Sequence, residues 1–385
     1  MFGTEPSPDI RIRVNGLQGA HGVLGLWRTV RSVQELVTEF FALPIVEIEP
    51  LTDDSVAITF GLDNLNRSRF AYRAGQHVTI RTIIDGQDIR RSYSICADAG
   101  LGDLRVGIRR LDGGVFSTWA TKELQVGDLL DVMPPVGEFT LPASNGPRAV
   151  GAIAAGSGIT PILSIATTLL AAEPDSSFTL IIGNRTVQSI MFLEELEGLK
   201  DRYTSRFQLI HILSREPSAV PLFSGRIDAA KLHELLDQII TEPIDDWFLC
   251  GPHEMVQAAA TVFDERTNSR IHEELFFSEP FVTAPEPPRS TEGLATVTFT
   301  LDGRTSIVAV DPGGSPILDY ALGVRSDLPF SCRGGVCATC KARVVEGEVR
   351  MDQNWCLVQE ELEAGLVLTC QSHPLSSQVL LDYDV

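Results

Sequence analysis

Hydrophobic and polar residues alternate along the chain between residues 42 and 141. The alternating runs end at Gly, Asp or Pro, which is typical of half-buried strands joined by turns. These runs are SVAITFGL (55–62), QHVTIRTII (76–84), IRRSYSICA (89–97), DLRVGIRRL (103–111) and DLLDVMPP (128–135). Several short strands with regular turns predict a small antiparallel β-barrel over residues 42–143.

From residue 144 to 282, continuous apolar runs alternate with stretches of helical spacing. The apolar runs are AVGAIAAG (149–156), FTLIIGN (178–184), FQLIHILS (207–214) and WFLC (247–250), and helices are expected at 160–172, 189–203, 228–240 and 253–263. This order predicts an α/β domain, a parallel sheet with helices on both faces and a ligand at the carboxyl ends of its strands.

The C-terminal part, residues 293–385, follows a Pro-rich, polar stretch at 283–292 that is expected to be a linker. Residues 294–310 alternate around Asp302-Gly303, a pair that favours the tight turn of a β-hairpin. A short helix within 315–330 and strands within 340–351 and 365–383 are expected to follow. A hairpin, a helix and a loop of this kind resemble the β-grasp ferredoxins.

The N-terminal extension, residues 1–41, predicts an amphipathic helix that packs on the barrel or on a partner. Its apolar residues recur near helical spacing, and they are Trp27, Val30, Val33, Val37, Phe40 and Phe41. The sequence assigns this extension no role.

Composition narrows the class of protein. The 385 residues are 44% hydrophobic and carry a net charge of −20, so a packed multidomain protein is expected and nucleic acid or an anionic membrane is excluded as the main partner. Residues 149–172 are uncharged, but glycines and Pro161 divide them, which favours a buried strand, loop and helix over a membrane span. Without a secretory signal, a cytoplasmic protein with reduced thiols is expected.

Four cysteines form the strongest motif. Cys332, Cys337 and Cys340 share one loop and Cys370 follows alone, a C-x4-C-x2-C spacing with a distant fourth thiol. This is the plant-type [2Fe–2S] pattern, whereas structural zinc, the alternative, normally takes two cysteine pairs. Gly334 and Gly335 let the loop close over a cluster. Cys96 and Cys356 lie outside the spacing and are expected to be packing thiols.

Two motifs in the predicted barrel suggest a flavin. Arg91 offers a guanidinium to a phosphate, Tyr93 a ring for stacking and Ser94 a hydroxyl beside that ring. Gly113, Gly114 and Ser117, in GGVFSTW, offer backbone and hydroxyl donors to a pyrophosphate.

These motifs, with GSGITP (156–161) and LCGPHEM (249–255) after them in order, resemble the ferredoxin–NADP reductase superfamily over residues 42–280. The resemblance implies that the barrel motifs bind the flavin. It also implies that the first turn of the second domain binds the pyridine nucleotide and that Cys250 and Gly251 lie beside the nicotinamide. The residues implied in that first turn are Gly156, Gly158 and Thr160. Tyr93, Ser94 and Cys250 are the residues implied at the reacting rings.

The nucleotide is expected to be NADPH. Arg185, Arg215 and Arg226 follow strand ends, and an NADP site needs cations for the 2′-phosphate, although three solvated surface arginines are the alternative. FAD is favoured as the flavin and FMN stays open. The aromatic rings Phe276, Phe277 and Phe281 are candidates to contact an adenine or to pack in the core.

The three predicted parts make an electron-transfer chain in which NADPH reduces a flavin, and the flavin reduces a [2Fe–2S] cluster that serves an external acceptor. The segments GNRTVQSIMFLEELEGLKDRY and SCRGGVCATCKARVVEGEVRMDQNW resemble the reductase components of phenylacetyl-CoA epoxidases, with Trp355 and Cys356 as departures. That resemblance implies a di-iron oxygenase as the partner. A Rieske-type oxygenase, such as a 3-ketosteroid 9α-hydroxylase, is the alternative, and a redox sensor without turnover is a more remote one.

Overall fold

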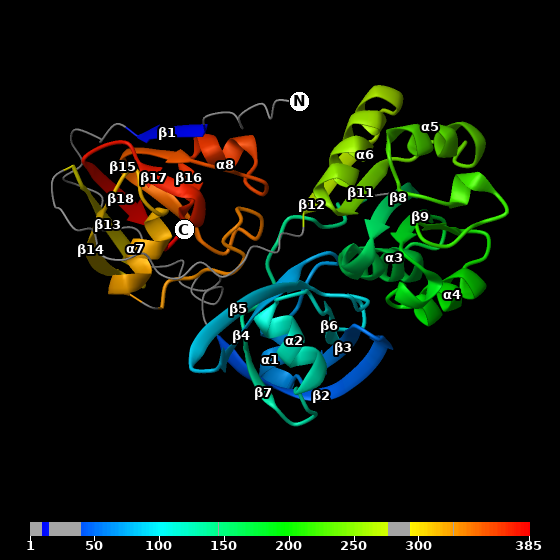
Figure 1. Cartoon of the computed structure of the whole chain (residues 1–385), viewed down its shortest axis with the longest axis horizontal. Helices are drawn as coiled ribbons and strands as arrows, with labels where there is room; N and C mark the ends of the chain where they lie inside the picture. The colour runs from blue at the N-terminus through cyan, green and yellow to red at the C-terminus, as the bar shows by residue number, and fades with distance from the viewer. Residues whose placement is uncertain (1–9, 15–39, 145, 276–292, 326) are drawn as a thin grey trace. The chain divides into compact units, whose positions relative to one another are not determined.

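The computed structural model describes residues 10–14, 40–144, 146–275, 293–325 and 327–385, and the chain divides into two compact units. One unit is Phe40–Ser278, and the other combines Met1–Glu39 with Glu279–Val385. Figure 1 shows the elements of each unit. Within the described residues, no helix is both long enough and apolar enough to cross a membrane.

The first half of the larger unit is an antiparallel sheet that closes into a barrel. Its six strands lie in the order β5-β4-β7-β2-β3-β6. A bridge between Ile95 and Val106 joins the two ends of that order. The elements are β2 (Phe41–Thr52), β3 (Ser55–Phe60), α1 (Asn64–Arg69), β4 (His77–Ile84), β5 (Gln87–Ser94), β6 (Leu104–Arg109), α2 (Val115–Lys122) and β7 (Leu129–Val132).

Alternate residues of these strands fill the barrel, as the sequence pattern predicts. Leu43, Ile45, Val78 and Ile80 are at most 1% exposed, and their sequence neighbours are more exposed or face the other side. Phe41 belongs to this strand pattern, so the predicted N-terminal helix is wrong at its last residue.

The second half of the unit is a five-stranded parallel sheet in the order β10-β9-β8-β11-β12. Figure 1 shows α3 and α4 on one side of it and α5 and α6 on the other. The elements are β8 (Ala149–Ala155), α3 (Ile159–Ala172), β9 (Ser177–Asn184), α4 (Leu193–Arg202), β10 (Phe207–Leu213), α5 (Ala229–Gln238), β11 (Asp246–Gly251), α6 (His253–Arg266) and β12 (Arg270–Leu275). The uncharged stretch 149–172 is the buried β8 and α3, as expected from its glycines and Pro161.

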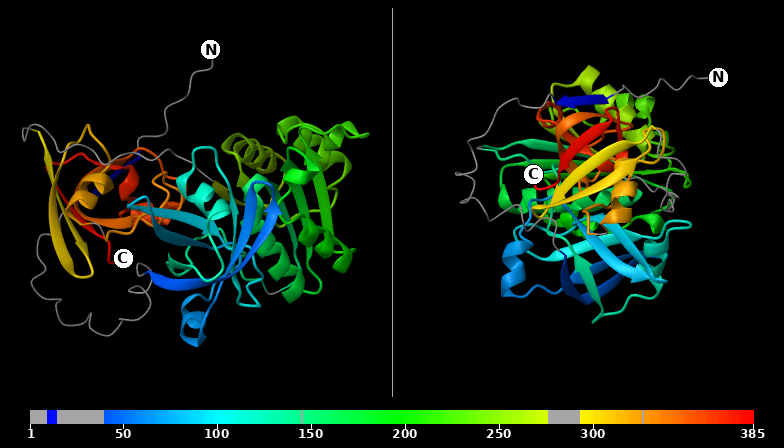
Figure 2. Two further views of the ribbon diagram at one scale, coloured as in Figure 1. Left: turned by 60° about the horizontal axis from the view of Figure 1, so that its bottom comes forward. Right: turned by 90° about the vertical axis from the view of Figure 1, so that its left-hand side faces the viewer.

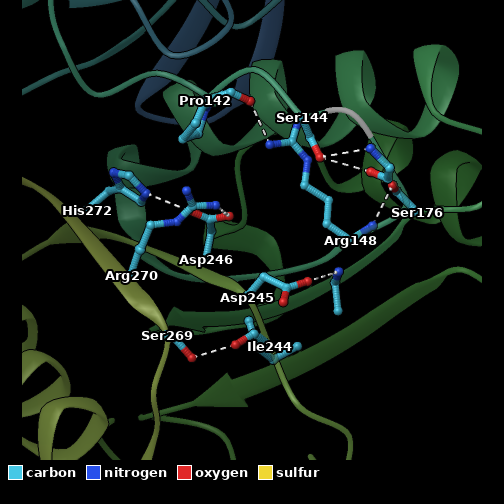
Figure 3. A network of polar contacts seen from close by, with 12 residues as sticks. Pro142, Ser144, Arg148, Ser176, Ile244, Asp245, Asp246, Ser269, Arg270 and His272 are labelled. Carbon is cyan, nitrogen blue, oxygen red and sulfur yellow. Dashed lines mark hydrogen bonds and ion pairs between the residues drawn. The ribbon is translucent and has the colours of Figure 1, made fainter.

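A polar network holds the amino ends of these strands (Figure 3). Asp246 is fully buried and accepts from Arg270 at 2.7 Å and His272 at 2.9 Å, while Asp245 accepts from the Ala149 backbone at 2.8 Å. Arg148, at the boundary between the two halves, pairs with Glu173 at 2.6 Å and donates to the Pro142 carbonyl at 2.6 Å. Arg148 thus connects the end of the first half, at Pro142, to the parallel sheet through a hydrogen bond.

The second unit is a β-grasp sheet in the order β1-β15-β18-β13-β14, with β16 and β17 also paired to β15. Figure 2 shows the β13–β14 hairpin beside β18. The elements are β13 (Ala295–Leu301), β14 (Arg304–Val310), α7 (Ile317–Val324), β15 (Lys341–Met351), α8 (Gln359–Glu363), β16 (Leu366–Leu368), β17 (Ser372–Pro374) and β18 (Gln378–Asp382). Asp302 and Gly303 both have positive φ, as the predicted tight turn requires.

The strand β1 (Ile10–Val14) corrects the prediction for the N-terminal extension, because these residues form an edge strand and not a helix. β1 pairs antiparallel with β15, and Arg13 forms an ion pair with Glu348 at 3.1 Å. The alternation of Ile and Arg in IRIRV explains the strand. Trp27, Val30, Val33 and Val37, which carried the helix prediction, lie outside the described residues.

Candidate functional site

The RSYS motif lies at the end of β5, where the pleat places Arg91 and Tyr93 on the same face. Tyr93 packs against Phe116, with ring centroids 5.5 Å apart, and burial raises the pKa of its hydroxyl above the ordinary range. The Arg91 guanidinium donates to the Arg90 carbonyl at 2.7 Å. The motif therefore offers a partly exposed ring and a cation side by side.

The GGVFSTW motif begins α2. Gly113 has a φ of +76°, and Gly114 is the N-cap residue. A Cβ on Gly114 would lie 2.6 Å from the Ser117 hydroxyl oxygen, so the turn requires glycine. Ser117 is buried and its hydroxyl accepts from the Leu111 backbone at 3.1 Å. The hydroxyl thus holds the turn, and the backbone N–H groups that begin α2 are the donors left for a phosphate.

The GSGITP motif forms the tight turn between β8 and α3. Gly156 has a φ of +57°, and a Cβ on Gly158 would lie 2.3 Å from the Cys250 carbonyl oxygen. Thr160 is buried, and its hydroxyl donates to the Ser157 carbonyl at 3.0 Å. Gly251 lies against Ala155 at the end of β8, since a Cβ there would be 3.2 Å from the Ala155 nitrogen. The two motifs that the sequence places about 90 residues apart therefore meet at the carboxyl ends of β8 and β11.

A carboxyl group that the sequence analysis missed joins the barrel to the parallel sheet. The Ser94 hydroxyl donates to the Glu274 carboxylate at 3.2 Å, and the Cys250 thiol approaches the same oxygen at 4.0 Å. Burial raises the pKa of Glu274 to about 8, and the Ser94 hydrogen bond acts in the opposite direction. Burial and then Glu274 raise the pKa of the Cys250 thiol well above its ordinary value.

The group formed by Ser94, Glu274 and Cys250 can take part in proton transfer. A carboxyl whose pKa is raised to about 8 and that is hydrogen-bonded to a hydroxyl can hold and pass on a proton, whereas a thiol with a raised pKa remains neutral. Glu274 lies opposite Cys250 in the β11–β12 register. Glu274 could have been found from the sequence if residues 270–275 had been predicted as a strand and paired with the strand that ends near Cys250.

The three predicted arginines lie at the carboxyl edge of the same sheet. The backbone nitrogen of Arg215 donates to the Arg185 carbonyl at 2.8 Å. Arg226 follows Gly225, whose backbone nitrogen donates to the Leu213 carbonyl, at the end of β10, at 3.0 Å. All three side chains are exposed. Among the residues that the structure describes, none of the three guanidinium groups has an ion pair or a side-chain hydrogen bond. Phe276, Phe277 and Phe281 lie outside those residues.

The four thiols of the second unit form two close pairs. The Cys332 thiol lies within hydrogen-bonding reach of Cys337, and Cys370 within reach of Cys340, which raises the pKa of Cys332 and Cys370 well above the ordinary value. Across the described part of the chain, no three such groups are gathered around the position of one metal ion. Two pairs of thiols fit the two irons of a [2Fe–2S] cluster, with two thiolates on each iron.

The loop backbone fits a cluster as well. The Cys332 nitrogen donates to the Cys337 sulfur at 3.5 Å, and the Gly334 nitrogen donates to the Cys332 sulfur at 3.4 Å. Arg333 has a φ of +55°, which is uncommon for a residue with a side chain. Its guanidinium pairs with Asp319 at 2.9 Å and its carbonyl accepts from Gln371 at 2.7 Å, so contacts outside the loop hold this conformation.

The two remaining thiols differ from each other. Cys96 is buried in the large core, as expected, and its thiol donates to the Arg105 carbonyl at 3.3 Å. Cys356 lies against the ligand loop, and its thiol donates to the Gly335 carbonyl at 3.4 Å. Cys356 is therefore a neighbour of the predicted cluster, a contact that the sequence analysis did not foresee.

Three stretches of the chain match families of known domains. Residues 42–141 match the oxidoreductase FAD-binding domain, residues 152–261 the oxidoreductase NAD-binding domain, and residues 299–375 the 2Fe-2S iron-sulfur cluster binding domain. The chain thus has FAD, a nicotinamide nucleotide and a [2Fe–2S] cluster as its cofactors.

Relatives match over nearly the whole chain. It is 40% identical over 352 residues to the E component of 1,2-phenylacetyl-CoA epoxidase of Escherichia coli, a match that covers 90% of this chain and 99% of that protein. It is 32% identical over 359 residues to the ferredoxin reductase component of 3-ketosteroid-9-alpha-monooxygenase of Mycobacterium tuberculosis, covering 89% of this chain and 95% of that one.

A solved structure shows the same domain order. Phthalate dioxygenase reductase aligns with a TM-score of 0.55 at 21% identity and covers 89% of this chain and 98% of its own. That likeness supports the fold, while the sequence matches establish the relationship. The chain belongs to the ferredoxin–NADP reductase superfamily, as an NAD(P)H-dependent flavin iron–sulfur oxidoreductase of the kind that serves oxygenases as their reductase component.

Proposed function

We propose that this chain is the reductase component of a phenylacetyl-CoA epoxidase and that it draws its electrons from NADPH. The observation that supports the partner is the 40% identity to the E component of the Escherichia coli enzyme over 99% of that protein. The observation that supports the nucleotide is the group of three exposed arginines whose guanidinium groups have no ion pair or hydrogen bond among the described residues, because a 2′-phosphate needs such cations.

The positions of the motif residues suggest which cofactor each of them binds. Tyr93 and Arg91 bind the flavin ring and phosphate from β5, and the first turn of α2, with Gly113, Gly114 and Ser117, holds the pyrophosphate. Gly156, Gly158 and Thr160 form the turn that receives the nucleotide. Cys250 and Gly251 border the nicotinamide because they end β11 directly beside that turn.

When bound, FAD accepts two electrons from the nicotinamide and releases them singly to the cluster. The chain supports this step in two ways. The Ser94 hydroxyl and the Glu274 carboxyl hold a proton at the junction of barrel and sheet, and the neutral Cys250 thiol adds no charge there. Cys332 and Cys337 are proposed to bind one iron, and Cys340 and Cys370 the other.

The test combines the purified chain with the oxygenase components of the Escherichia coli phenylacetyl-CoA epoxidase and phenylacetyl-CoA. Epoxide formation that needs this chain, with NADPH far better than NADH, is the expected result. Rapid ferricyanide reduction without any epoxide would contradict the proposed partner but leave the electron-transfer role intact.

A second candidate is the reductase of a Rieske-type oxygenase, which the 32% identity to the 3-ketosteroid-9-alpha-monooxygenase component supports. This candidate predicts turnover with a 3-ketosteroid hydroxylase component and no epoxide with the phenylacetyl-CoA epoxidase components. A redox sensor would show neither, and it would also reduce ferricyanide or cytochrome c too slowly to be a catalyst.

A further inference from the structure

The strand β1 joins the N-terminal end of the chain to the unit that contains the four cluster thiols, here called the cluster unit. In the β1–β15 register, Ile12 lies opposite Val349 and Arg13 lies opposite Glu348. Val349 is fully buried, and Ile12 packs against the same core. Arg13 is exposed and pairs with Glu348 at 3.1 Å. Opposite residues of neighbouring strands share one face of a sheet, so an apolar contact and an ion pair fix this register.

β1 covers an edge of the sheet that would otherwise be open. Residues 349–351 of β15 pair with β17 on one side and with β1 on the other. Without β1, the backbone N–H and C=O groups along residues 347–351 would have no strand beside them on that side in the described part of the chain. The three matched domains begin at residue 42 or later, so β1 is an addition to them.

The pairing of β1 gives the chain two connections between its units. Residues 15–39 lead from β1 to β2 of the barrel, and residues 276–292 lead from β12 of the parallel sheet to β13. β1 and β13 are three places apart in the sheet order, a separation of about 14 Å at about 4.8 Å per strand. The cluster unit is therefore attached through two separate strands, and without the β1 pairing only the connection at β13 would hold it.

We propose that β1 is a strap: its pairing with β15 holds the cluster unit by a second connection, and this connection speeds electron transfer within the chain. In that step one electron leaves the reduced flavin and reduces the cluster. A unit held at one point turns freely about that point. A second, separate attachment limits the rotation and raises the effective concentration of one redox group near the other. The proposal rests on the electron-transfer role of the chain and not on the identity of the oxygenase.

The alternative is that β1 only stabilises the sheet and that the connection itself has no function. A change in the length of residues 15–39 separates the two, because it leaves β1 and its pairing intact. The first experiment therefore inserts about 30 Gly and Ser residues within residues 15–39 of the full-length holoprotein. The matched control carries the same insertion ahead of Ile10, where it does not lengthen the connection. The third variant is Ile12→Asp, which disfavours the pairing itself.

Stopped-flow absorbance with excess NADPH measures the reduction of flavin and of cluster in each protein. The internal insertion is expected to slow cluster reduction about threefold, because effective concentration falls roughly as the −3/2 power of a connection that about doubles in length. Ile12→Asp should slow it about tenfold or more, because the second connection opens. Flavin reduction, ferricyanide reduction and cluster absorbance do not involve the connection and should stay within about twofold of wild type. The control insertion should match wild type throughout.

A second experiment asks directly whether β1 holds the two units together. A protease recognition sequence within residues 283–292 allows the purified holoprotein to be cut, so that the β1–β15 pairing replaces the covalent link to residues 293–385. The cut protein is expected to sediment as one particle, because the main-chain hydrogen bonds of an added strand provide affinity. Ile12→Asp should weaken this association about tenfold or more. The matched control is Arg13→Ala, which removes an exposed ion pair from the same strand and should weaken it only about twofold.

Four results would overturn the proposal. Cut wild-type pieces that separate at once would show that β1 does not hold the units, and pieces that stay together in Ile12→Asp would show that another surface does. Cluster reduction that the internal insertion leaves unchanged would mean that β1 contributes stability alone. A wild-type dimer that Ile12→Asp converts into monomers would show that β1 is donated to a second copy. Absence of cluster reduction in every protein would contradict the electron-transfer role itself, while sedimentation would still decide whether β1 joins the units.

Discussion

Both ends of the parallel sheet in Phe40–Ser278 carry charged residues, but those at the amino ends of the strands are paired and the arginines at the carboxyl ends are not. At the amino ends, Arg148, Arg270 and Asp246 are all paired, and Asp246 is fully buried (Figure 3). At the carboxyl ends, Arg185, Arg215 and Arg226 are exposed, and their guanidinium groups have no ion pair or hydrogen bond among the described residues. Charges that the fold already neutralises support architecture, and charges left in solvent at strand ends are available to a ligand.

This contrast predicts which substitutions alter stability and which alter binding. Removal of one member of a buried pair leaves the other charge uncompensated, and that cost appears in the free energy of unfolding. Removal of an exposed arginine that no acid neutralises leaves no such charge behind, so its effect appears only when the nucleotide binds.

The largest effect is expected from Asp246→Ala. It should lower the free energy of unfolding by about 3 kcal/mol, at the low end for a buried pair because the Arg270 side chain, 62% exposed, can turn to water. Urea unfolding followed by circular dichroism measures it. The control is Asp237→Ala, whose pair with Arg266 is exposed and should contribute less than about 1 kcal/mol. Equal effects in the two variants would contradict the contrast.

Next in size is the combined variant Arg185→Ala/Arg215→Ala/Arg226→Ala. KM for NADPH should rise about a hundredfold, because charge-assisted hydrogen bonds to a phosphate are lost, while KM for NADH stays near wild type. Steady-state ferricyanide reduction with each nucleotide measures both. Arg202→Ala, an exposed arginine of α4, is the control and should change neither. If NADH binding weakens equally, the arginines do not recognise the 2′-phosphate.

Some of this architecture could be read from the sequence and some could not. The cysteine spacing, the Asp302-Gly303 hairpin and the alternation in residues 42–141 are local patterns, and each predicts its element directly. Glu274 could not be found in this way, because only the β11–β12 register and a contact from Ser94 identify it. The cofactor roles of Arg91, Tyr93, Ser117 and Cys250 remain predictions.

The N-terminal extension shows why a local pattern can mislead. The helical spacing of the apolar residues after Trp27 led to the prediction of a helix, although the five residues Ile10–Val14 alternate as in a strand. These five residues form a strand because they pair with an edge of β15, which lies more than 300 residues later in the sequence. The contact of Trp355 with Gly335 is likewise a tertiary contact without a sequence signal.

A smaller effect is expected from Glu274→Gln. The native pKa of about 8 lies above the ordinary value of 4.5, so the native state binds the extra proton. The stability from this group is full below about pH 4.5 and is lost as pH rises through about 8. Turnover with NADPH should also fall above about pH 8 as the proton is lost.

In Glu274→Gln both pH dependences should flatten, with turnover at neutral pH lower by about tenfold or more. Rate and urea-unfolding profiles between about pH 5 and about pH 9.5 measure them. Asp103→Asn, an acid outside this junction, is the control. A wild-type profile that is flat through this range would remove Glu274 from the proposed proton path.

The smallest effect is expected from the exposed ion pair between Arg13, on the edge strand β1, and Glu348. Arg13 is 71% exposed in its pair with Glu348, so Arg13→Ala should lower the stability of the cluster unit by no more than about 0.5 kcal/mol. Ile12 is partly buried and packs against the core of that unit, and Ile12→Asp should cost about 1–3 kcal/mol because it removes this apolar contact and partly buries a charge. Loss of cluster absorbance in urea follows both. A large effect of Arg13→Ala would mean that exposure does not separate structural from available charges, and the comparison between the two sheet ends would lose its basis.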